Sequence, residues 1–389
     1  MQSIDFQPRT RLVFGLGTVA RLGELVRELA GTRALVVSDP GVVAAGHFER
    51  GTDSLRQAGV EVCPFHGVLE NPSTVEVAAG LAVAQQFQPD ILIGLGGGSS
   101  MDCAKGINFL FSCGGRMEDY WGIGKATAPM LPMVAVPTTA GTGSEAQSFA
   151  LISQAESHIK MACGDPRAAF RIALLDPELT VTQPARVTAL TGMDAVSHAI
   201  ESYVTRKRNP LSVCYSREAW QLLSEGFPRV LDDPQDIEAR SMVQLGAYFS
   251  GLAIETSMLG AAHALANPLT ARYDVAHGQA VGVMLPHVVR YNSGNAANSS
   301  SSAKWYAQLA SDIPDAPVTA NAQEAVEYLI AYLKRLLSAA NLATQLRALH
   351  VDTDHFNALG VEAAKQWTGA FNPRPLTEPE FVELYRQAW

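Results

Sequence analysis

The residues best suited to metal chemistry lie in the second half of this 389-residue chain. Asp194 and His198 are four apart in an apolar segment, so a helix would place both on one face, one turn apart. His263 and His277 each follow in a small, apolar context. The four side chains together offer three imidazole nitrogens and one carboxylate oxygen, which suits Fe²⁺ or Zn²⁺ better than Ca²⁺ or Mg²⁺. A lone histidine on an apolar face is more often an ordinary core residue, so the hypothesis depends on the whole set.

A glycine-rich turn in the first half has the character of a phosphate-binding site. An apolar run over 91–95 leads into Gly96, Gly97, Gly98 and Ser99, after which a helical pattern begins. Glycine backbone lets an anion approach closely, and the first N–H groups of a helix can bind it. A rival, Gly15-Leu16-Gly17-Thr18-Val19-Ala20, matches the G-x-G-x-x-A fingerprint after a short strand. Spacing alone does not decide between the two turns.

Two further features suit a nucleotide. Asp39 ends another expected strand, where a carboxylate can accept hydrogen bonds from ribose hydroxyls and would repel a 2′-phosphate. It therefore favours NAD over NADP, although an ordinary loop aspartate would have the same position. The run over 137–145, which includes Thr138 and Thr139, concentrates hydroxyls and glycines after an apolar strand. Such groups suit the sugar and phosphates of a nucleotide, and a polar turn could share this composition.

Hydrophobic periodicity divides the chain into two parts. Up to residue 182, short apolar runs alternate with helical patterns. We predict strands at 11–14, 34–38, 60–65, 91–95 and 133–137, and helices at 18–30 and 73–87. This alternation is typical of a parallel sheet covered by helices. Beyond residue 182 the strand signals nearly vanish, and helical segments follow, separated by prolines that include Pro228 and Pro268. The expected fold is α/β plus all-α, with a Rossmann-like dinucleotide-binding domain over 1–182 and an all-helical metal-binding domain over 183–389.

Composition narrows the possible partners. The chain has 29 basic and 38 acidic side chains, a formal net charge of −9, and no basic run, which argues against nucleic acid and anionic membranes. No window approaches the roughly 18 apolar residues of a membrane-spanning helix. Its five cysteines are dispersed, without a C-x-x-C pair, which favours a reducing, cytoplasmic setting. The low charged fraction, 17%, predicts extensive burial in the core or in a subunit interface.

These segments, in this order, resemble the iron-containing alcohol dehydrogenase family, the group III dehydrogenases, which share their architecture with glycerol dehydrogenase and dehydroquinate synthase. The resemblance extends over essentially the whole chain. It rests on the Gly96-Gly97-Gly98-Ser99 turn with Asp102, on Pro137-Thr138-Thr139 with Gly143-Ser144-Glu145, on Asp176-Pro177 with Leu179-Thr180, on Gly192-Met193-Asp194 with His198, on His263 and on His277-Gly278.

The resemblance implies a site for each of two cofactors. A metal would be held by Asp194, His198, His263 and His277, in the cleft between the two domains. NAD would lie with its pyrophosphate at Gly96 to Ser99, its adenosine near Asp39 and further contacts from Asn71, Asp102, Thr138, Thr139, Lys160 and Leu179. The turn at Gly15 would then be structural. One position departs from the family: many members have a histidine, thought to relay the alcohol proton, where this chain has Asn267, whose amide is neither acid nor base near neutral pH.

The activity that the resemblance implies is reversible hydride transfer between a small alcohol and its aldehyde or ketone. The expected metal is Fe²⁺, with Zn²⁺ compatible, and the expected assembly is a cytoplasmic homodimer. Three alternatives share the architecture: a glycerol or diol dehydrogenase, a maleylacetate reductase, which generally works without the metal, and a dehydroquinate-synthase-like lyase. The lyase would need several Lys or Arg groups, which the metal-site segments nearly lack. A non-catalytic NAD-binding protein is the simplest alternative outside enzymes.

Overall fold

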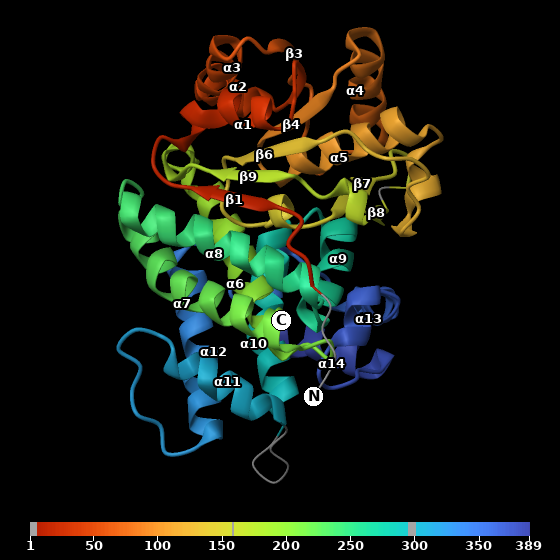
Figure 1. Cartoon of the computed structure of the whole chain (residues 1–389). Helices are drawn as coiled ribbons and strands as arrows, with labels where there is room; N and C mark the ends of the chain where they lie inside the picture. Colours follow the sequence, from red (N-terminus) through yellow and green to blue (C-terminus); the bar gives the residue numbers. More distant parts are fainter. Residues whose placement is uncertain (1–5, 158, 295–300) are drawn as a thin grey trace. The chain divides into compact units, whose positions relative to one another are not determined.

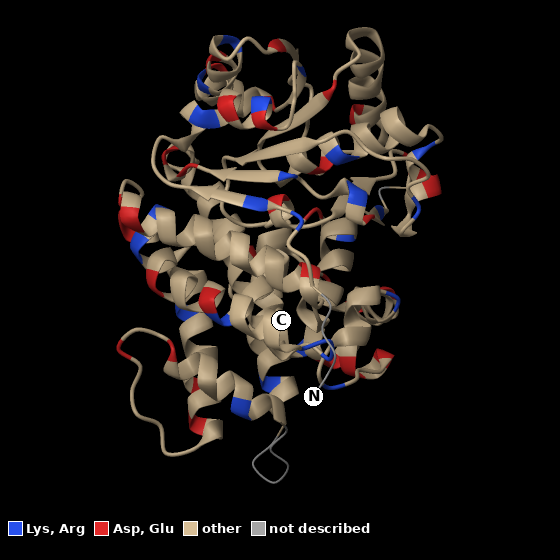
Figure 2. Ribbon diagram, viewed as in Figure 1, with Lys and Arg blue, Asp and Glu red and all other residues tan. Residues whose placement is uncertain are grey.

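The computed structural model describes residues 6–157, 159–294 and 301–389 of the chain (Figure 1). Its internal contacts fall into two compact units, Met1–Gln183 and Pro184–Trp389. Within the described residues, no helix is both long and apolar enough to cross a membrane. Figure 2 shows acidic and basic residues interspersed along the described ribbon, without a continuous basic stretch.

The first unit is built around a six-stranded sheet in which all neighbouring strands are parallel. In spatial order its strands are β1 (Arg11–Phe14), β9 (Ile172–Leu175), β6 (Met133–Pro137), β4 (Ile91–Gly96), β2 (Arg33–Val37) and β3 (Glu61–Phe65). The five strands that the sequence predicts are confirmed. The apolar pattern does not single out β9, which completes the sheet between β1 and β6.

Each face of this sheet has its own helical cover. The helices of the unit are α1 (Leu22–Glu28), α2 (Pro40–Ala44), α3 (His47–Gln57), α4 (Thr74–Phe87) and α5 (Gly98–Cys113). Ala34 and Val36 of β2 share a core with α1 and α3, whereas Leu35 and Val37 share the other core with α4 and α5. Strand side chains alternate between faces, so burial on both sides explains why these strands are continuous apolar runs.

The carboxyl ends of the parallel strands meet at one edge of the sheet. Asp39 follows β2, the glycine turn joins β4 to α5, and Thr138 follows β6. A second, three-stranded sheet consists of β5 (Gly122–Ile123), β8 (Lys160–Gly164) and β7 (Phe149–Ser153). The predicted cofactor residues are therefore distributed over turns at that carboxyl edge and over the start of β8.

Within the described residues of the second unit, helices are the only regular secondary structure, as the periodicity predicts. Its α-helices are α6 (Ala185–Val204), α7 (Pro210–Asp232), α8 (Ile237–Thr256), α9 (Ala261–Tyr273), α10 (His277–Ser293), α11 (Ser301–Ser311), α12 (Ala322–Ala339), α13 (Phe356–Ala364) and α14 (Glu378–Ala388). Helix α6 packs against α7, α8 and α10, and every residue from Gly192 to Val204 is buried. A helix that is buried on all sides can hold polar residues only where they find partners.

Two prolines that we expect to separate helices instead lie inside them. Pro228 is within α7 and Pro268 is within α9, so this detail of the sequence prediction is wrong. Each proline removes one backbone hydrogen bond. Burial of Phe227 beside Pro228, and of Leu269 beside Pro268, supplies packing that offsets the loss.

Candidate metal centre and nucleotide-binding loop

Helix α6 supplies two of the four predicted metal ligands. Asp194 and His198 lie on the same face of this helix, and Nε2 of His198 is 3.3 Å from Oδ1 of Asp194. Both residues are about 95% buried, with 5% and 6% of their surface exposed. The spacing of four residues therefore has the consequence that the sequence predicts.

The other two histidines come from neighbouring helices of the same unit. His263 lies in the first turn of α9, and His277 is the first residue of α10. A β-carbon on Gly278 would lie 2.0 Å from the backbone oxygen of Leu190 in α6. Because only glycine permits this approach, Gly278 sets the start of α10, and with it His277, directly against α6.

Imidazole nitrogens of the three histidines approach one atom, Oδ1 of Asp194. Nε2 of His263 is 3.6 Å from Oδ1 of Asp194, and Nε2 of His277 is 3.7 Å from the same oxygen. These separations are too long for hydrogen bonds, but tetrahedral ligands about 2.1 Å from one ion lie about 3.4 Å apart. Ligand atoms of Asp194, His263 and His277 all lie within 4.8 Å of one another, and His198, which approaches Asp194, is not part of this mutually close group. The arrangement fits a small cation.

Electrostatics at this centre favour positive charge. Within the described residues, Oδ1 of Asp194 and Nε2 of His263 are buried and have no hydrogen-bond partner. Burial raises the pKa of Asp194, but the neighbouring imidazoles, His198 foremost, outweigh it and hold that pKa below its usual value. Burial lowers the pKa of His263, yet Asp194 and Glu201 outweigh it and raise the pKa to about 9. A buried carboxylate with an unsatisfied oxygen is the donor that a divalent ion needs.

The glycine turn between β4 and α5 packs closely against the segment that follows β6. A β-carbon on Gly98 would lie 2.6 Å from Oγ1 of Thr142, and one on Gly97 would lie 3.2 Å from the methyl group of Thr139. The N–H of Thr138 donates to the oxygen of Gly96 at 2.9 Å. The first N–H groups of α5 have no acceptor within the helix, so they are available to an anion.

Three other predicted cofactor residues adjoin the start of α5. Asp39 caps α2 through the N–H of Val42, and its Oδ2 accepts from Oγ of Ser100 at 3.2 Å. The N–H of Asn71 donates to Oγ of Ser99 at 3.2 Å, and Nζ of Lys160 donates to Oδ1 of Asn71 at 3.0 Å. Asp39, Ser99, Asn71 and Lys160, which are far apart in sequence, are thus joined around one turn.

The last two predicted cofactor residues are buried. Asp102 accepts from Oγ of Ser144 at 2.6 Å, and burial raises its pKa while Lys105 opposes the rise. Leu179, in the short helix η5 (Pro177–Thr180), is 1% exposed and belongs to the core beneath β1 and β4. Its side chain is therefore unavailable to a nucleotide, whereas Asp102 retains 8% exposure beside the turn.

Two residues with no predicted role, Glu201 and Lys105, lie beside these predicted sites. Glu201 accepts a hydrogen bond from Nδ1 of His263 at 2.6 Å. Lys105 is fully buried, and its Nζ donates to the backbone oxygens of Ser144 and Phe149. Spacing offers a signal in each case, since Glu201 lies seven residues after Asp194 and Lys105 lies three after Asp102, each on the same helix face. Asn267, the departure from the family pattern, donates to Oε1 of Gln366 at 2.9 Å.

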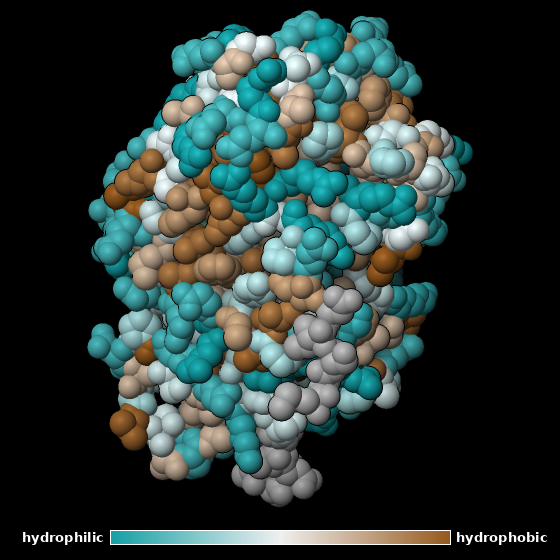
Figure 3. Space-filling view, in the orientation of Figure 1, coloured by the Kyte–Doolittle hydropathy of each residue, from teal (hydrophilic) through white to brown (hydrophobic). Residues whose placement is uncertain are grey.

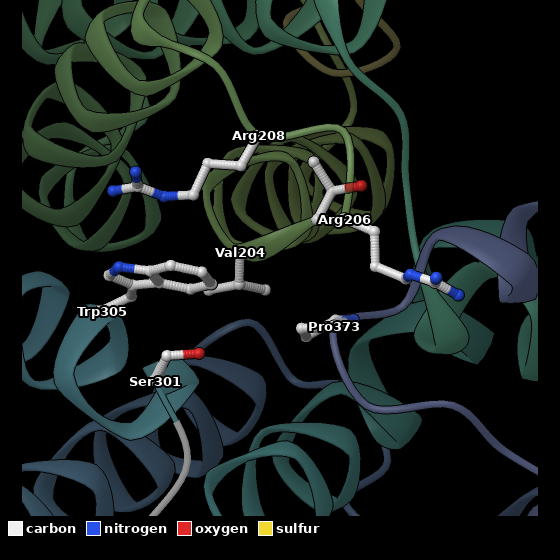
Figure 4. Close-up of a pocket in the computed structure, with 7 residues that line it drawn as sticks. Val204, Arg206, Arg208, Ser301, Trp305 and Pro373 are labelled. Atoms are coloured by element: carbon white, nitrogen blue, oxygen red, sulfur yellow. The ribbon is translucent and has the colours of Figure 1, made fainter. Parts of the chain in front are cut away.

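A cavity of about 290 Å³ in the second unit is lined by residues outside the predicted sites. It is lined by Val204, Thr205, Arg206, Arg208, Ser301, Trp305 and Pro373. Figure 4 shows the guanidinium groups of Arg206 and Arg208 pointing to opposite sides of the cavity. The guanidinium of Arg208 stacks on Trp305, 4.6 Å from the ring centre. Because its charged groups diverge, this cavity lacks the convergent polar set of a small-molecule site.

Comparison with known proteins gives one consistent result over both halves of the chain. Residues 8–177 match the family model described as iron-containing alcohol dehydrogenase, and residues 188–389 match the C-terminal model of the Fe-containing alcohol dehydrogenase family. The 1,3-propanediol dehydrogenase of Klebsiella pneumoniae is 34% identical over 378 residues, which cover 97% of this chain and 96% of that protein. The NAD-dependent methanol dehydrogenase of Bacillus methanolicus is 31% identical, with 97% of each chain covered.

The solved structures agree. A crystal structure of a 1,3-propanediol oxidoreductase superimposes with a TM-score of 0.94 at 33% identity, covering 100% of both chains. An iron-containing alcohol dehydrogenase from Thermotoga maritima superimposes with a TM-score of 0.82 at 26% identity, covering 99% of both. Since family models match both halves and relatives more than 30% identical match the whole length, this chain belongs to the iron-containing alcohol dehydrogenase family and is an alcohol oxidoreductase.

Proposed function

We propose that this enzyme is NAD-linked and metal-dependent, and that it transfers hydride reversibly between a small alcohol and its aldehyde or ketone. The observation that carries the proposal is the convergence of three imidazole nitrogens on one carboxylate oxygen. Nε2 of His198, His263 and His277 lies 3.3, 3.6 and 3.7 Å from Oδ1 of Asp194. We assign all four residues as ligands of one divalent ion.

Fe²⁺ is the proposed ion, and the family to which the chain belongs supports that choice. Zn²⁺ is the alternative, because both ions accept imidazole and carboxylate ligands. When bound, such an ion supplies a Lewis acid for the oxygen of the alcohol or of the carbonyl compound. The chain itself contributes one negative charge from Asp194 and three donor nitrogens. Asp194, His198 and His263 are buried, which strengthens their electrostatic interactions, whereas His277 is partly exposed.

NAD is the proposed hydride carrier, and it supplies an acceptor carbon on its nicotinamide ring when bound. We assign the pyrophosphate to the N–H groups at Gly96, Gly97, Gly98 and Ser99, where α5 begins. Asp39 would accept hydrogen bonds from the ribose, while Asn71, Asp102, Thr138, Thr139 and Lys160 complete the surroundings. Leu179 contributes only backbone in this scheme, because its side chain is in the core. The relative from Bacillus methanolicus, described as NAD-dependent, supports the choice of cofactor.

The proposed substrate is a small alcohol, with short primary alcohols and diols as the first candidates. Two relatives support this range, since one is described as acting on 1,3-propanediol and the other on methanol. Asn267 and Gln366 add an uncharged polar pair one turn beyond His263. Neither amide can exchange a proton near neutral pH, so we propose that this pair contacts a polar substrate group without acid or base chemistry.

We further propose a homodimer located in the cytoplasm. Met242, Leu245, Phe249 and Leu252 form a partly exposed apolar stripe along α8, and Figure 3 shows apolar surface where α8 lies in Figure 1. All five cysteines are free, which suits a reducing compartment. Light scattering on the purified protein tests the assembly, and a mass of one chain would contradict it.

The test of the activity begins with protein purified without oxygen. We expect about one divalent ion per chain and NADH formation with a panel of short alcohols and diols. Chelation should abolish NADH formation, and added Fe²⁺ or Zn²⁺ should restore it. The variants Asp194→Ala and His263→Ala should bind no ion and lose nearly all activity, whereas His350→Asn, at an exposed position, should retain both. Full turnover in a metal-free variant, or no NADH with any alcohol, would overturn the proposal.

A further inference from the structure

Glu201 occupies a third position on the face of α6 that carries Asp194 and His198. The three residues are spaced i, i+4 and i+7, so they lie in a row along the helix. Glu201 is only 3% exposed. A buried carboxylate requires partners that compensate the loss of water, and those partners identify what it does.

Three donors converge on the carboxylate of Glu201. Its Oε2 accepts from Nδ1 of His263 at 2.6 Å and from the N–H of Gly260 at 3.1 Å. Its Oε1 accepts from the N–H of Ala262 at 2.7 Å. All three donors lie within four consecutive residues at the start of α9. Glu201 therefore forms hydrogen bonds with both the imidazole of His263 and the backbone at the start of α9.

We propose that Glu201 is a positioning residue for the metal centre, and this proposal rests on the ligand assignment above. By accepting the proton on Nδ1, Glu201 leaves Nε2 of His263 as the ring nitrogen that is directed to the ion. That nitrogen faces Oδ1 of Asp194, which is 3.6 Å away. Both atoms are among the ligands that we assign to the ion. A carboxylate behind a metal-binding histidine fixes the orientation of the ring and makes its nitrogen a stronger donor.

Only a carboxylate satisfies all three donors. A glutamine at position 201 has one acceptor oxygen and one amide NH₂ group. If the NH₂ takes the place of Oε1, it faces the N–H of Ala262, and donor meets donor. If it takes the place of Oε2, it faces Nδ1 of His263 and favours a proton on Nε2, which blocks metal binding there. The Glu201→Gln variant therefore loses either the start of α9 or the orientation of His263.

A purely structural role for Glu201 is the competing explanation, and Asn372 provides the matched control. Oδ1 of Asn372 accepts from the N–H of Ala261, at 3.3 Å, so it too holds the first turn of α9. No contact of Asn372 with His263 is present among the described side-chain hydrogen bonds. Asn372→Ala should thus weaken α9 without touching the histidine, whereas Glu201→Gln should affect the metal.

The experiment measures metal affinity rather than turnover. Metal-free wild type, Glu201→Gln and Asn372→Ala are titrated with Co²⁺, whose visible absorption reports its ligand geometry. We expect Glu201→Gln to bind Co²⁺ about 10 to 100 times more weakly than wild type. Asn372→Ala should have a lower melting temperature but a Co²⁺ affinity within about threefold of wild type. Equal affinity in wild type and Glu201→Gln would overturn the positioning role while leaving the metal assignment intact.

A second measurement remains decisive if Glu201→Gln does not fold. In wild-type protein loaded with Zn²⁺ and labelled with ¹⁵N-histidine, NMR should detect a slowly exchanging proton on Nδ1 of His263. The signal is assigned by its through-space contacts with the N–H groups of Gly260 and Ala262, which donate to the same carboxylate. A His263 that carries no proton on Nδ1 would overturn the proposal. Wild type that binds neither Co²⁺ nor Zn²⁺ would instead refute the metal centre itself, so the two failures are distinguishable.

Discussion

The carboxylate of Asp176 accepts a hydrogen bond from the N–H of Gly17 at 3.1 Å, with the two residues 159 positions apart in the chain. The second oxygen of the same carboxylate accepts from the N–H of Val19, also at 3.1 Å. The N–H groups that a fingerprint of the type G-x-G-x-x-A would offer to a phosphate are therefore occupied by an anion of the protein itself. A second negative group at this turn would be repelled. This contact argues against phosphate binding at the turn from Gly15 to Gly17, which the spacing alone leaves open. It therefore favours the turn at Gly96 as the phosphate-binding site.

Alanine at two glycines distinguishes the turns experimentally. Gly98→Ala should weaken NADH binding by at least about tenfold, because its β-carbon would lie 2.6 Å from Thr142 and displace the turn. Gly17 has a φ of 70° and open space around it, so Gly17→Ala should cost about 1 to 2 kcal/mol of stability and leave NADH binding unchanged. Fluorescence titration with NADH and urea unfolding measure the two effects. Weakened NADH binding in Gly17→Ala alone would reverse the assignment.

Removal of the charge at Asp39 should relax the choice between NAD and NADP. Asn caps helices as well as Asp does, so Asp39→Asn keeps the cap on α2 and removes only the negative charge. The ratio of kcat/KM for NADP to kcat/KM for NAD should rise about tenfold, equivalent to about 1.4 kcal/mol. Asp53→Asn, on the exposed side of α3, should leave this ratio unchanged. An identical ratio in both variants would show that Asp39 is not the selector.

Lys105 should be among the most costly positions in the first unit. Its Nζ donates to the oxygen and Oγ of Ser144 and to the oxygen of Phe149, and it lies 3.8 Å from the buried Asp102. Lys105→Met would remove the donor from these acceptors and the neighbouring cation from Asp102. We expect the free energy of unfolding to fall by about 3 to 5 kcal/mol. Urea unfolding measures the loss. Lys125→Met, at an exposed position, should cost less than about 0.5 kcal/mol, and comparable losses in both variants would contradict the stabilising role of the Lys105 contacts.

Glu145 should make stability depend on pH. Burial raises its pKa to about 7, despite the opposing charge of Lys105, and Asp102 adds to the rise. The folded state therefore binds more protons than the unfolded state between about pH 4.5 and 7, so this contribution to stability is lost as pH rises through that range. The loss amounts to about 3 kcal/mol. Glu145→Gln, which mimics the neutral acid, should be more stable than wild type at about pH 8 but equal to it at about pH 5.

The control for this pH effect is an exposed carboxylate. Glu70→Gln removes a charge from the surface and should unfold like wild type at both pH values. If the difference in free energy of unfolding between Glu145→Gln and wild type stays constant from about pH 5 to 8, Glu145 does not titrate in this range.

Local pattern determined much of the architecture. The strands at 11–14 and 133–137 follow from short apolar runs, because burial on both faces of a parallel sheet leaves no polar alternation. The pairing of Asp194 with His198 follows from helical geometry alone, since residues four apart share a face. Glycines at 96–98 likewise reveal a turn before a helix, because no other residue type tolerates such close packing. Each of these inferences uses neighbours within about a dozen residues.

The tertiary structure decided what depends on distant segments. Only the packing of α9 and α10 on α6 brings His263 and His277 to Asp194. Likewise, only the position of β9 beside β1 brings the carboxylate of Asp176 to the N–H of Gly17 in the first glycine turn. Glu201 acquires its role in the same way, through residues about sixty positions later in the chain. Periodicity reports which face of an element is buried, but not which element covers it. That choice comes from the mutual fit of whole helices and strands, to which every side chain in the core contributes at once.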